Sequence, residues 1–236
     1  MKAQGPKAIV FTDWDGTVTL QDSNDYMTDT LGFGLKKRKD VAQLMLNEKL
    51  SFRDGFREML QSITDNHHSL EDCIKVLLKN IHIDPGFKSF LEWCRSNNIP
   101  LYVISSGMKP IINALLKNYM GEKDESYISI IANDAKTDPN DKYKWEIVYR
   151  DETPFGHDKS RSINKILSSY KGSKPMVFYC GDGISDLSAS KCCDVLFARS
   201  GENLVTYCNR QNIPYEEFST FNDIKKKISE TMEEIN

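Results

Sequence analysis

The stretch IVFTDWDGT, residues 9–17, decides the fold of this 236-residue chain. Its first residues are apolar, as in a strand covered on both faces, and the strand ends at Asp13 and Asp15. Side chains at positions i and i+2 of an extended chain point to the same side, so these two carboxylates can converge on one point. Two close carboxylates repel each other unless a cation or a shared proton offsets their charge. The expected companion is a hard cation such as Mg²⁺, which takes oxygen ligands. A surface turn is the alternative, because Asp and Gly are common in turns.

The rest of the chain alternates between strand and helix patterns. Apolar runs predict further strands over residues 99–104, 127–132, 176–180 and 195–198. An exposed strand is expected over residues 142–149, joined to its predecessor by a hairpin connection over 134–141. Strands that alternate with helices predict an α/β protein with a doubly wound, Rossmann-like parallel sheet covered by helices on both faces.

About sixty residues after the first strand show only helical patterns and predict a small all-helical cap. Helix N-terminal signals occur at Asp22 and at Ser69, and the second of these begins a capping box. We therefore expect two parts: an α/β core formed by residues 1–20 and 83–236, and a cap formed by residues 21–82. A cap of this size suits a lid over a small substrate.

Polar side chains follow three of the predicted buried strands. They are Asp13 and Asp15, then Ser105, then Asp182 and Asp186. In a doubly wound sheet the carboxyl ends of the strands meet along one edge, where ligands bind. Lys159, at a predicted helix start, can join them there. Four carboxylates, a hydroxyl and an ammonium group suit a phosphate and a divalent cation.

With these elements in this order, the chain resembles the haloacid dehalogenase-like phosphatases. The matching motifs are DWDGT at residues 13–17, the strand that ends in Ser105, Lys159, and GDGISD at residues 181–186. The resemblance implies that Asp13 is the nucleophile and forms an aspartyl-phosphate. It also implies that Asp15 protonates the leaving alcohol and later deprotonates the attacking water.

The resemblance further implies where the metal and the phosphate bind. Mg²⁺ would be held by the side chains of Asp13 and Asp182 and by the main-chain carbonyl of Asp15. Asp186 would bind a metal-coordinated water or orient Lys159, which offsets charge on the transferred phosphoryl group. The phosphate oxygens would contact Lys159, Ser105, Ser106 and Gly107.

The predicted cap resembles that of the phosphoserine-phosphatase-like branch of this family and would close over a small phosphorylated metabolite. The cap residues expected to contact the substrate are Asp22, Asn24, Tyr26, Arg53 and Arg57. Two positions depart from the phosphoserine pattern. Asp22 replaces a glutamate that would hold the substrate amine, and Met59 falls where an arginine would hold its carboxylate. Serine phosphate is therefore disfavoured.

The C-terminal part, from Asp194 to Phe221, most resembles bacterial methylthiopentenyl-phosphate phosphatases and their fungal relatives, which are associated with sugar-alcohol phosphates. The Asp, Asn and Tyr side chains of the predicted cap can hydrogen-bond hydroxyl groups. We expect Mg²⁺-dependent hydrolysis of a small phosphomonoester, with a polyol or sugar phosphate as substrate. The alternatives are a phosphoserine- or methylthiopentenyl-type phosphatase, a phosphomutase, and a non-catalytic module that binds a phosphorylated ligand.

The composition argues against other classes of partner. The formal net charge is −3, with 28% charged and 39% hydrophobic residues, which indicates neither nucleic acid nor a membrane surface as a partner. We find no transmembrane run and no signal-peptide core before the first strand. The six cysteines lack zinc-ligand spacing, which favours a reducing compartment. We expect a cytoplasmic protein, with the nucleus also compatible. The oligomeric state stays open, a monomer included.

Overall fold

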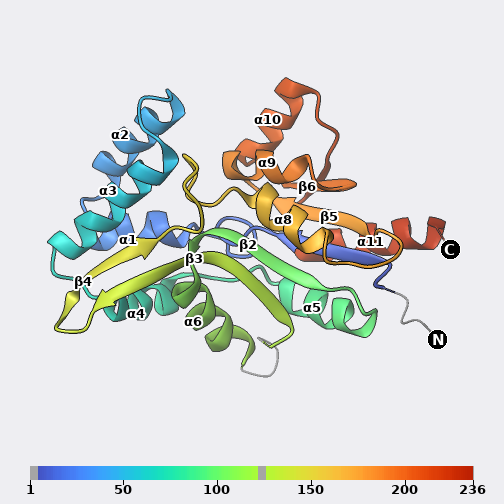
Figure 1. Cartoon of the computed structure of the whole chain (residues 1–236), viewed down its shortest axis with the longest axis horizontal. Coiled ribbons are helices and arrows are strands. Elements are labelled where there is room, and N and C mark those ends of the chain that lie inside the picture. Colours follow the sequence, from blue (N-terminus) through green and yellow to red (C-terminus); the bar gives the residue numbers. More distant parts are fainter. Residues whose placement is uncertain (1–4, 122–125, 236) are drawn as a thin grey trace.

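A seven-stranded sheet forms the centre of the computed structural model, which describes residues 5–121 and 126–235 (Figure 1). The spatial order of these described strands is β4 (Asp141–Val148), β3 (Ile128–Asp138), β2 (Leu101–Met108), β1 (Ala8–Thr12), β5 (Met176–Gly181), β6 (Val195–Arg199) and β7 (Glu216–Phe218). Within the described ranges, neighbouring strands run parallel except β3 and β4, which are antiparallel. The predicted α/β class with a doubly wound, mostly parallel sheet is confirmed.

β1 lies at the centre of the sheet because its residues are apolar on both faces. Ile9 and Phe11 pack into one buried cluster, whereas Ala8 and Val10 pack into a second cluster on the opposite face. All four side chains are at most 1% exposed, and their alternation follows the period of two of a strand. The carboxyl end of β1, where Asp13 follows, is therefore flanked by β2 and β5.

Helices cover both faces of the sheet, as the alternation of patterns predicted. One face packs against α5 (Phe87–Ser96), α6 (Lys109–Met120) and α11 (Phe221–Ile235). The other face packs against α8 (Lys159–Leu167), α9 (Leu187–Ser190) and α10 (Asn203–Gln211). Figure 1 shows α5 and α6 below the sheet and α9 and α10 above it. A single 3₁₀ turn, η1 (Ile184–Asp186), leads from the end of β5 into α9.

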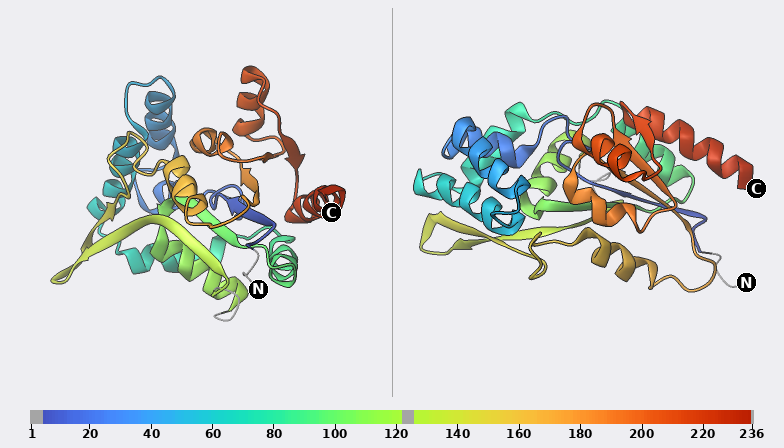
Figure 2. Two further views of the ribbon diagram at one scale, coloured as in Figure 1. Left: turned by 45° about the vertical axis from the view of Figure 1, so that its right-hand side comes forward. Right: turned by 90° about the horizontal axis from the view of Figure 1, so that it is seen from above.

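Four helices follow β1 in the described chain and gather at one end of the molecule (Figure 2). They are α1 (Ser23–Leu31), α2 (Leu35–Leu46), α3 (Phe52–Asp65) and α4 (Leu70–Asn80). Asp22 caps α1, and Ser69 caps α4 with the predicted capping box. Met27, Phe56 and Leu77 of these helices belong to the same buried cluster as α5 and α6. Because the inserted helices share this core, the division into core and cap stays a prediction.

The hairpin formed by β3 and β4 differs from the sequence prediction. Residues 134–138 belong to β3 and pair with β4, so Pro139 and Asn140 alone connect the two strands. The predicted connection over residues 134–141 is therefore wrong. Trp145 and Ile147 of β4 are buried in the cluster that the inserted helices join. This long-range packing stabilises a longer hairpin than the local pattern indicated.

Two other strands also differ from the sequence prediction. β2 continues beyond residue 104 through Ser105 to Met108, where Met108 pairs with Asn133 of β3. β7 was missed because it has three residues and one buried side chain, Phe218, which is too short for a periodic signal.

The helices of the described chain are of ordinary length for a globular protein. The longest of those described, α11, has 15 residues and an amphipathic pattern. None of the described helices has both the length and the apolar composition that a bilayer crossing requires.

Candidate active site

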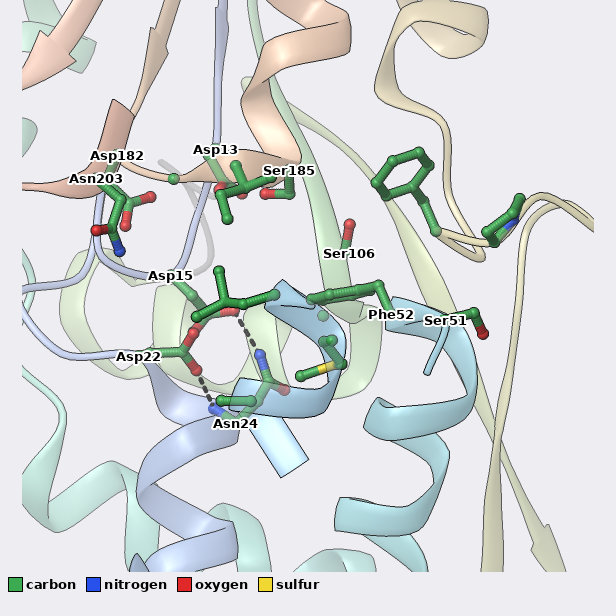
Figure 3. A pocket seen from close by; sticks show the side chains of 18 of the residues that line it. Asp13, Asp15, Asp22, Asn24, Ser51, Phe52, Ser106, Asp182, Ser185 and Asn203 are labelled. Atoms are coloured by element: carbon green, nitrogen blue, oxygen red, sulfur yellow. Dashed lines mark hydrogen bonds between the residues drawn. The ribbon is translucent and has the colours of Figure 1, made fainter. Parts of the chain in front are cut away.

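Three neighbouring parallel strands bring the predicted polar side chains to one edge of the sheet. Asp13 directly follows β1, Ser105 lies near the end of β2, and Asp182 directly follows β5. Because β1 pairs with both β2 and β5, these three strand ends lie side by side. A cavity of about 730 Å³ opens at this edge, between the sheet and the inserted helices (Figure 3).

The cavity has a polar floor and a partly apolar wall. The floor is formed by Asp13, Asp15, Ser105, Ser106, Gly107 and Asp182. The start of α1 adds Asp22 and Asn24. The segment from the end of α2 to the start of α3 adds an apolar wall, which includes Met45, Leu46, Leu50 and Phe52. The arrangement suits a charged group on the floor and a less polar body above it.

Lys159 is buried next to the floor of the cavity, between the carboxylates of Asp13 and Asp186. Its side chain is 1% exposed, and its Nζ lies 2.8 Å from Asp13 Oδ2 and 2.6 Å from Asp186 Oδ1. Burial disfavours the ammonium, but attraction to Asp13 and Asp186 outweighs burial and raises the pKa of Lys159. The lysine therefore stays charged beside Asp13 at neutral pH.

Asp186 is completely buried and accepts four hydrogen bonds. Its Oδ1 accepts from Lys159 Nζ at 2.6 Å and from the Tyr179 hydroxyl at 2.5 Å. Its Oδ2 accepts from the backbone N–H groups of Asp182 and Gly183, each at 3.0 Å. With both oxygens engaged, Asp186 orients Lys159 and fixes the turn that carries Asp182.

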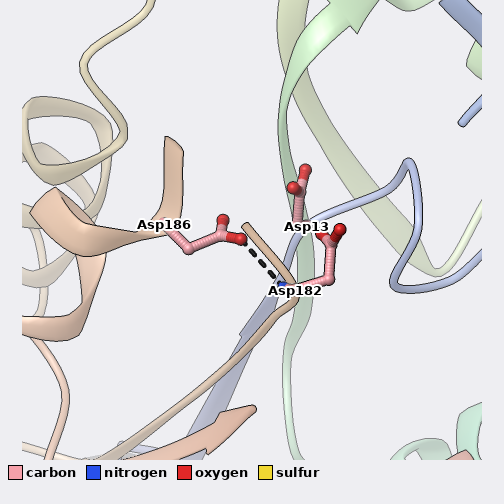
Figure 4. Close-up of side chains that lie close together, drawn as sticks. All are labelled: Asp13, Asp182 and Asp186. Carbon is pink, nitrogen blue, oxygen red and sulfur yellow. Dashed lines mark hydrogen bonds between the residues drawn. The ribbon is translucent and has the colours of Figure 1, made fainter. Parts of the chain in front are cut away.

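Asp13, Asp182 and Asp186 form an acidic cluster in which one oxygen of each carboxylate lies within 4.8 Å of the others (Figure 4). Burial and the charge of Asp186 raise the pKa of Asp13 to about 7. Burial, Asp186 and Asp13 raise the pKa of Asp182 to about 9. A divalent cation relieves such repulsion, so this oxygen donor set fits one. Because Asp186 already has four donors, Asp13 and Asp182 are the better placed ligands.

The turn after Asp15 is shaped to approach Asp182. Gly16 has φ +72°, a conformation that favours glycine, and a Cβ there would lie 2.5 Å from Asp182 Oδ2. The Thr17 hydroxyl donates to Asp182 Oδ1 at 3.0 Å. A larger residue at Gly16 would displace this carboxylate, so the Gly-Thr pair keeps Asp182 next to the turn that carries Asp13.

Asp15 is held by the first turn of α1. Its Oδ1 accepts from the backbone N–H of Ser23 at 2.8 Å and from the Ser23 hydroxyl at 2.6 Å, and its Oδ2 accepts from Asn24 Nδ2 at 2.9 Å. Burial and the charge of Asp22 raise the pKa of Asp15 well above its ordinary value. A carboxyl group with a raised pKa can hold a proton near neutral pH, as a general acid must.

Ser105, Ser106 and Gly107 form the part of the floor that lies near the end of β2. The Gly107 N–H donates to Ser105 Oγ at 2.9 Å. His157 Nδ1 lies 2.7 Å from the Ser105 carbonyl oxygen, and Asn133 Nδ2 donates to the Ser106 carbonyl oxygen at 2.7 Å. The sequence contains no recognisable signal for these two braces, because both act between segments far apart along the chain.

The structure separates the cap residues that the sequence singled out. Asp22 and Asn24 line the cavity, whereas Tyr26, Arg53 and Arg57 are not among its lining residues. Tyr26 is partly buried and packs against the core cluster instead. That these last three residues contact the substrate therefore stays a prediction.

The two arginines lie away from the cavity because α3 packs against the segment that follows β4. Arg53 Nη1 lies 3.3 Å from Glu152 Oε2, and its backbone carbonyl accepts from the Tyr149 hydroxyl at 2.6 Å. The Arg57 guanidinium lies over the Tyr149 ring, 5.3 Å from its centroid. These contacts direct both side chains toward the β4 side of α3.

The apolar wall was missed by the sequence analysis. Leu46 and Phe155 both line the cavity and are 55% and 43% exposed. Exposed large apolar side chains next to a cavity indicate a binding surface. From the sequence alone, Leu46 is only the end of a predicted helix and Phe155 only part of a loop. The exposure of these two side chains indicates the binding surface, and exposure is known only from the fold.

Comparison with known proteins adds relatives that cover almost the whole chain. The model of the haloacid dehalogenase-like hydrolases matches residues 10–191. The polyol phosphate phosphatase PYP1 of Saccharomyces cerevisiae is 51% identical over 232 residues, which cover 96% of this chain and 94% of that protein. Pdp3-interacting factor 1 of Schizosaccharomyces pombe is 46% identical over 226 residues, 96% of each chain. A 2-hydroxy-3-keto-5-methylthiopentenyl-1-phosphate phosphatase of Bacillus cereus is 31% identical over 229 residues, 95% of this chain and 97% of that protein.

Solved structures share the fold. One, described as a phospho-aspartyl intermediate analogue of phosphoserine phosphatase, aligns with a TM-score of 0.67 at 14% identity, covering 94% of this chain and 99% of that chain. At this identity the likeness shows the fold alone. The matched residues 10–191 contain the DWDGT motif, Ser105, Lys159 and the GDGISD motif. This chain therefore belongs to the haloacid dehalogenase-like hydrolase family.

Proposed function

We propose that this protein is a Mg²⁺-dependent phosphatase that hydrolyses a polyol phosphate through an aspartyl-phosphate on Asp13. The observation that carries this proposal is the cavity, whose floor holds Asp13, Asp15 and Asp182 and whose upper walls carry hydrogen-bonding but no cationic groups among the described residues. The 51% identical relative, which is named a polyol phosphate phosphatase, supports the same substrate class.

The residues of the floor, together with Lys159, support this reaction. Asp13 attacks the phosphorus atom, and the bond between phosphorus and the ester oxygen breaks. Lys159, oriented by Asp186 and 2.8 Å from Asp13, offsets negative charge on the phosphoryl group during transfer. Asp15 protonates the leaving alkoxide, then takes a proton from the water that releases inorganic phosphate and regenerates Asp13. Asp13 and Asp182 would hold Mg²⁺, which would neutralise charge on the phosphate.

The remainder of the cavity suits a neutral alcohol. Among the lining residues in the described part of the chain, none is Lys, Arg or His. A substrate that carries a carboxylate, such as phosphoserine, would therefore have no cationic partner there. Arg57 lies over the Tyr149 ring instead. A polyol requires hydrogen-bonding groups, and the lining residues that offer them above the floor include Asp22, Asn24, Glu48, Ser51, Ser185 and Asn203.

A second candidate substrate is a methylthiopentenyl phosphate. The apolar wall formed by Met45, Leu46, Leu50 and Phe52 suits an apolar substrate tail. The 31% identical Bacillus cereus protein is named for such a substrate. We favour the polyol because the relative named for polyol phosphates is far more similar to this chain.

The test is phosphate release from a panel of phosphate esters in the presence of Mg²⁺. The panel contains sorbitol, ribitol, erythritol and glycerol phosphates, sugar phosphates, phosphoserine and the methylthiopentenyl phosphate. We expect the best polyol phosphate to exceed phosphoserine in kcat/KM by at least about 100-fold, because the site lacks a carboxylate partner. EDTA should abolish release, and added Mg²⁺ should restore it. Metal-independent release would refute the role of the cation, and no release from any ester would refute the catalytic proposal.

A further inference from the structure

His157 is a buried histidine with both ring nitrogens engaged. Its Nδ1 lies 2.7 Å from the Ser105 carbonyl oxygen near the end of β2, and its Nε2 lies 2.9 Å from the Ser162 hydroxyl of α8. The residue is 2% exposed, and it is not among the residues of the described chain that line the cavity. A ring in this position does not exchange protons with a substrate, so its contribution lies in the groups that it holds.

The partners of His157 determine which nitrogen carries its proton. A backbone carbonyl can only accept a hydrogen bond, so Nδ1 carries the proton and donates to Ser105. Burial lowers the pKa of His157 to about 4, which keeps the ring neutral at neutral pH. Nε2 then has no proton, and the Ser162 hydroxyl donates to it.

The hydrogen bond to Ser105 orients part of the cavity floor. In a trans peptide the carbonyl oxygen and the following N–H point in opposite directions, so a fixed Ser105 carbonyl also fixes the Ser106 N–H. Asn133 Nδ2 donates to the next carbonyl, that of Ser106, at 2.7 Å. The same segment lies close to the general acid, since a Cβ built on Gly107 would lie 3.0 Å from Asp15 Oδ2. A tilted Ser105–Ser106 peptide would therefore change the proposed phosphate contacts and the packing against Asp15.

The hydrogen bond from Ser162 connects the same ring to the helix that carries Lys159. Lys159 is the first residue of α8, and Ser162 lies in the same first turn. The ring is thus attached to β2 through Nδ1, and to α8 through Nε2 and through the chain itself. One buried side chain therefore holds the floor residue Ser105 in a fixed position relative to the ammonium of Lys159.

We infer that His157 is a positioning residue of this active site, which orients the Ser105–Ser106 peptide for the phosphate and fixes its place relative to Lys159. His157 has this role only if the proposed function holds, and it acts without touching the substrate. The proton on Nδ1 is the essential feature, because it makes the contact with the floor. Ser162 contributes by donating to Nε2, which keeps the proton on Nδ1.

Two substitutions separate the Nδ1 contact from the rest of the ring. In His157→Asn the amide nitrogen is attached to Cγ, as Nδ1 is, so it can still donate to Ser105. In His157→Gln the amide nitrogen lies one bond further along the side chain and leaves the Ser105 carbonyl without this donor. With Mg²⁺ and the best polyol phosphate, kcat/KM should fall by about 10- to 100-fold in His157→Gln, because the floor is misplaced. The Ki of inorganic phosphate should rise in the same variant, and His157→Asn should be at least about 5-fold more active than His157→Gln.

The outcomes distinguish positioning from a purely structural role. Both variants lose a buried contact, so a purely structural role predicts a lower Tm with wild-type kcat/KM and Ki below that temperature. Wild-type constants in His157→Gln, or equal losses in the two variants, would overturn the inference and leave the proposed function intact. His67→Gln, the same change at an exposed residue beyond the end of α3, should keep the wild-type constants. No phosphate release by the wild type from any ester would overturn both.

A measurement on the wild type does not depend on whether these variants fold. Nitrogen NMR of protein labelled at histidine, with Mg²⁺ present, reports which ring nitrogens carry a proton, and Ser162→Ala identifies the His157 signals by removing the partner of Nε2. We expect His157 to carry its proton on Nδ1 at neutral pH, and inorganic phosphate to shift the Nδ1 resonance. A proton on Nε2, or no response of Nδ1 to saturating phosphate, would overturn the inference.

Discussion

Lys159→Met removes the buried ammonium that lies between Asp13 and Asp186. Methionine has a similar length and can fill the same space, so the change tests charge more than packing. In the wild type, Nζ lies 2.8 Å from Asp13 Oδ2 and 2.6 Å from Asp186 Oδ1, and the lysine side chain is 1% exposed. The substitution leaves both carboxylates buried without their shared counter-charge.

The expected loss of stability follows from these contacts. Breaking a buried ion pair by removing one partner costs about 3–5 kcal/mol, because the remaining charge stays buried and uncompensated. Asp13 keeps the Trp14 N–H at 2.7 Å, and Asp186 keeps the Tyr179 hydroxyl and two backbone donors, so the loss should not exceed this range. For a chain of this size, such a loss lowers Tm by about 6–20 °C.

The loss should also depend on pH. Burial and Asp186 already raise the pKa of Asp13 to about 7 with Lys159 in place, and without the ammonium this carboxyl binds a proton more readily. As the pH falls, protonation removes one uncompensated charge from the variant. The difference in free energy of unfolding between wild type and Lys159→Met should therefore be larger near about pH 8 than near about pH 6.

Urea unfolding followed by circular dichroism, with EDTA present so that bound metal cannot replace the ammonium, measures this difference. The matched control is Lys165→Met, which makes the same change at an exposed position of α8 and should stay within about 0.5 kcal/mol of wild type. A difference below about 1 kcal/mol for Lys159→Met at both pH values would show that Lys159 is not the counter-charge of this cluster, and the argument for its place in the site would fail.

Two further predictions follow from the same site. Asp13→Asn should reduce phosphate release to background because the amide cannot form the aspartyl-phosphate, while the circular dichroism spectrum stays that of the wild type; a variant that retains turnover would exclude Asp13 as nucleophile. Burial, reinforced by the positive charges of Lys159 and Arg150, lowers the pKa of His157 to about 4, although its contact with the Ser105 carbonyl opposes the shift. The folded state therefore holds it neutral while the unfolded chain protonates near about 6.5. The unfolded state thus binds more protons between these values, and stability present above about pH 6.5 should fall by up to about 3 kcal/mol as the pH approaches 4. His157→Gln should lack this component, so equal pH slopes for variant and wild type in urea unfolding would contradict it.

Much of the fold and of the candidate site could be predicted because the responsible signals are local. Asp13 and Asp15 follow a strand that is apolar on both faces, which places them at the carboxyl edge of a parallel sheet. Asp22 and Ser69 cap helices because a side-chain oxygen must satisfy the first free N–H groups of a helix. Such signals act within a few residues, so they can be recognised without knowledge of the tertiary structure.

The predictions that failed depend on contacts between distant segments. The hairpin of β3 and β4 is longer than predicted because Trp145 and Ile147 pack into the core cluster shared with the inserted helices. Arg53 and Arg57 are on the predicted helix, and only the structure shows that both contact the segment after β4 and that neither lines the cavity. A helical period shows which residues share a face, but not which neighbour that face meets.

The sequence by itself determined the sheet, its carboxyl edge and the order of the motif residues, because these follow from short-range patterning and chain topology. The tertiary structure alone decided that Lys159 is buried between Asp13 and Asp186, and that Asp186 has its acceptors taken by four donors. It also decided that Asn24 donates to the Asp15 carboxylate through its Nδ2. These features depend on distances of a few ångströms between residues far apart in the chain, and only packing of the whole molecule sets such distances.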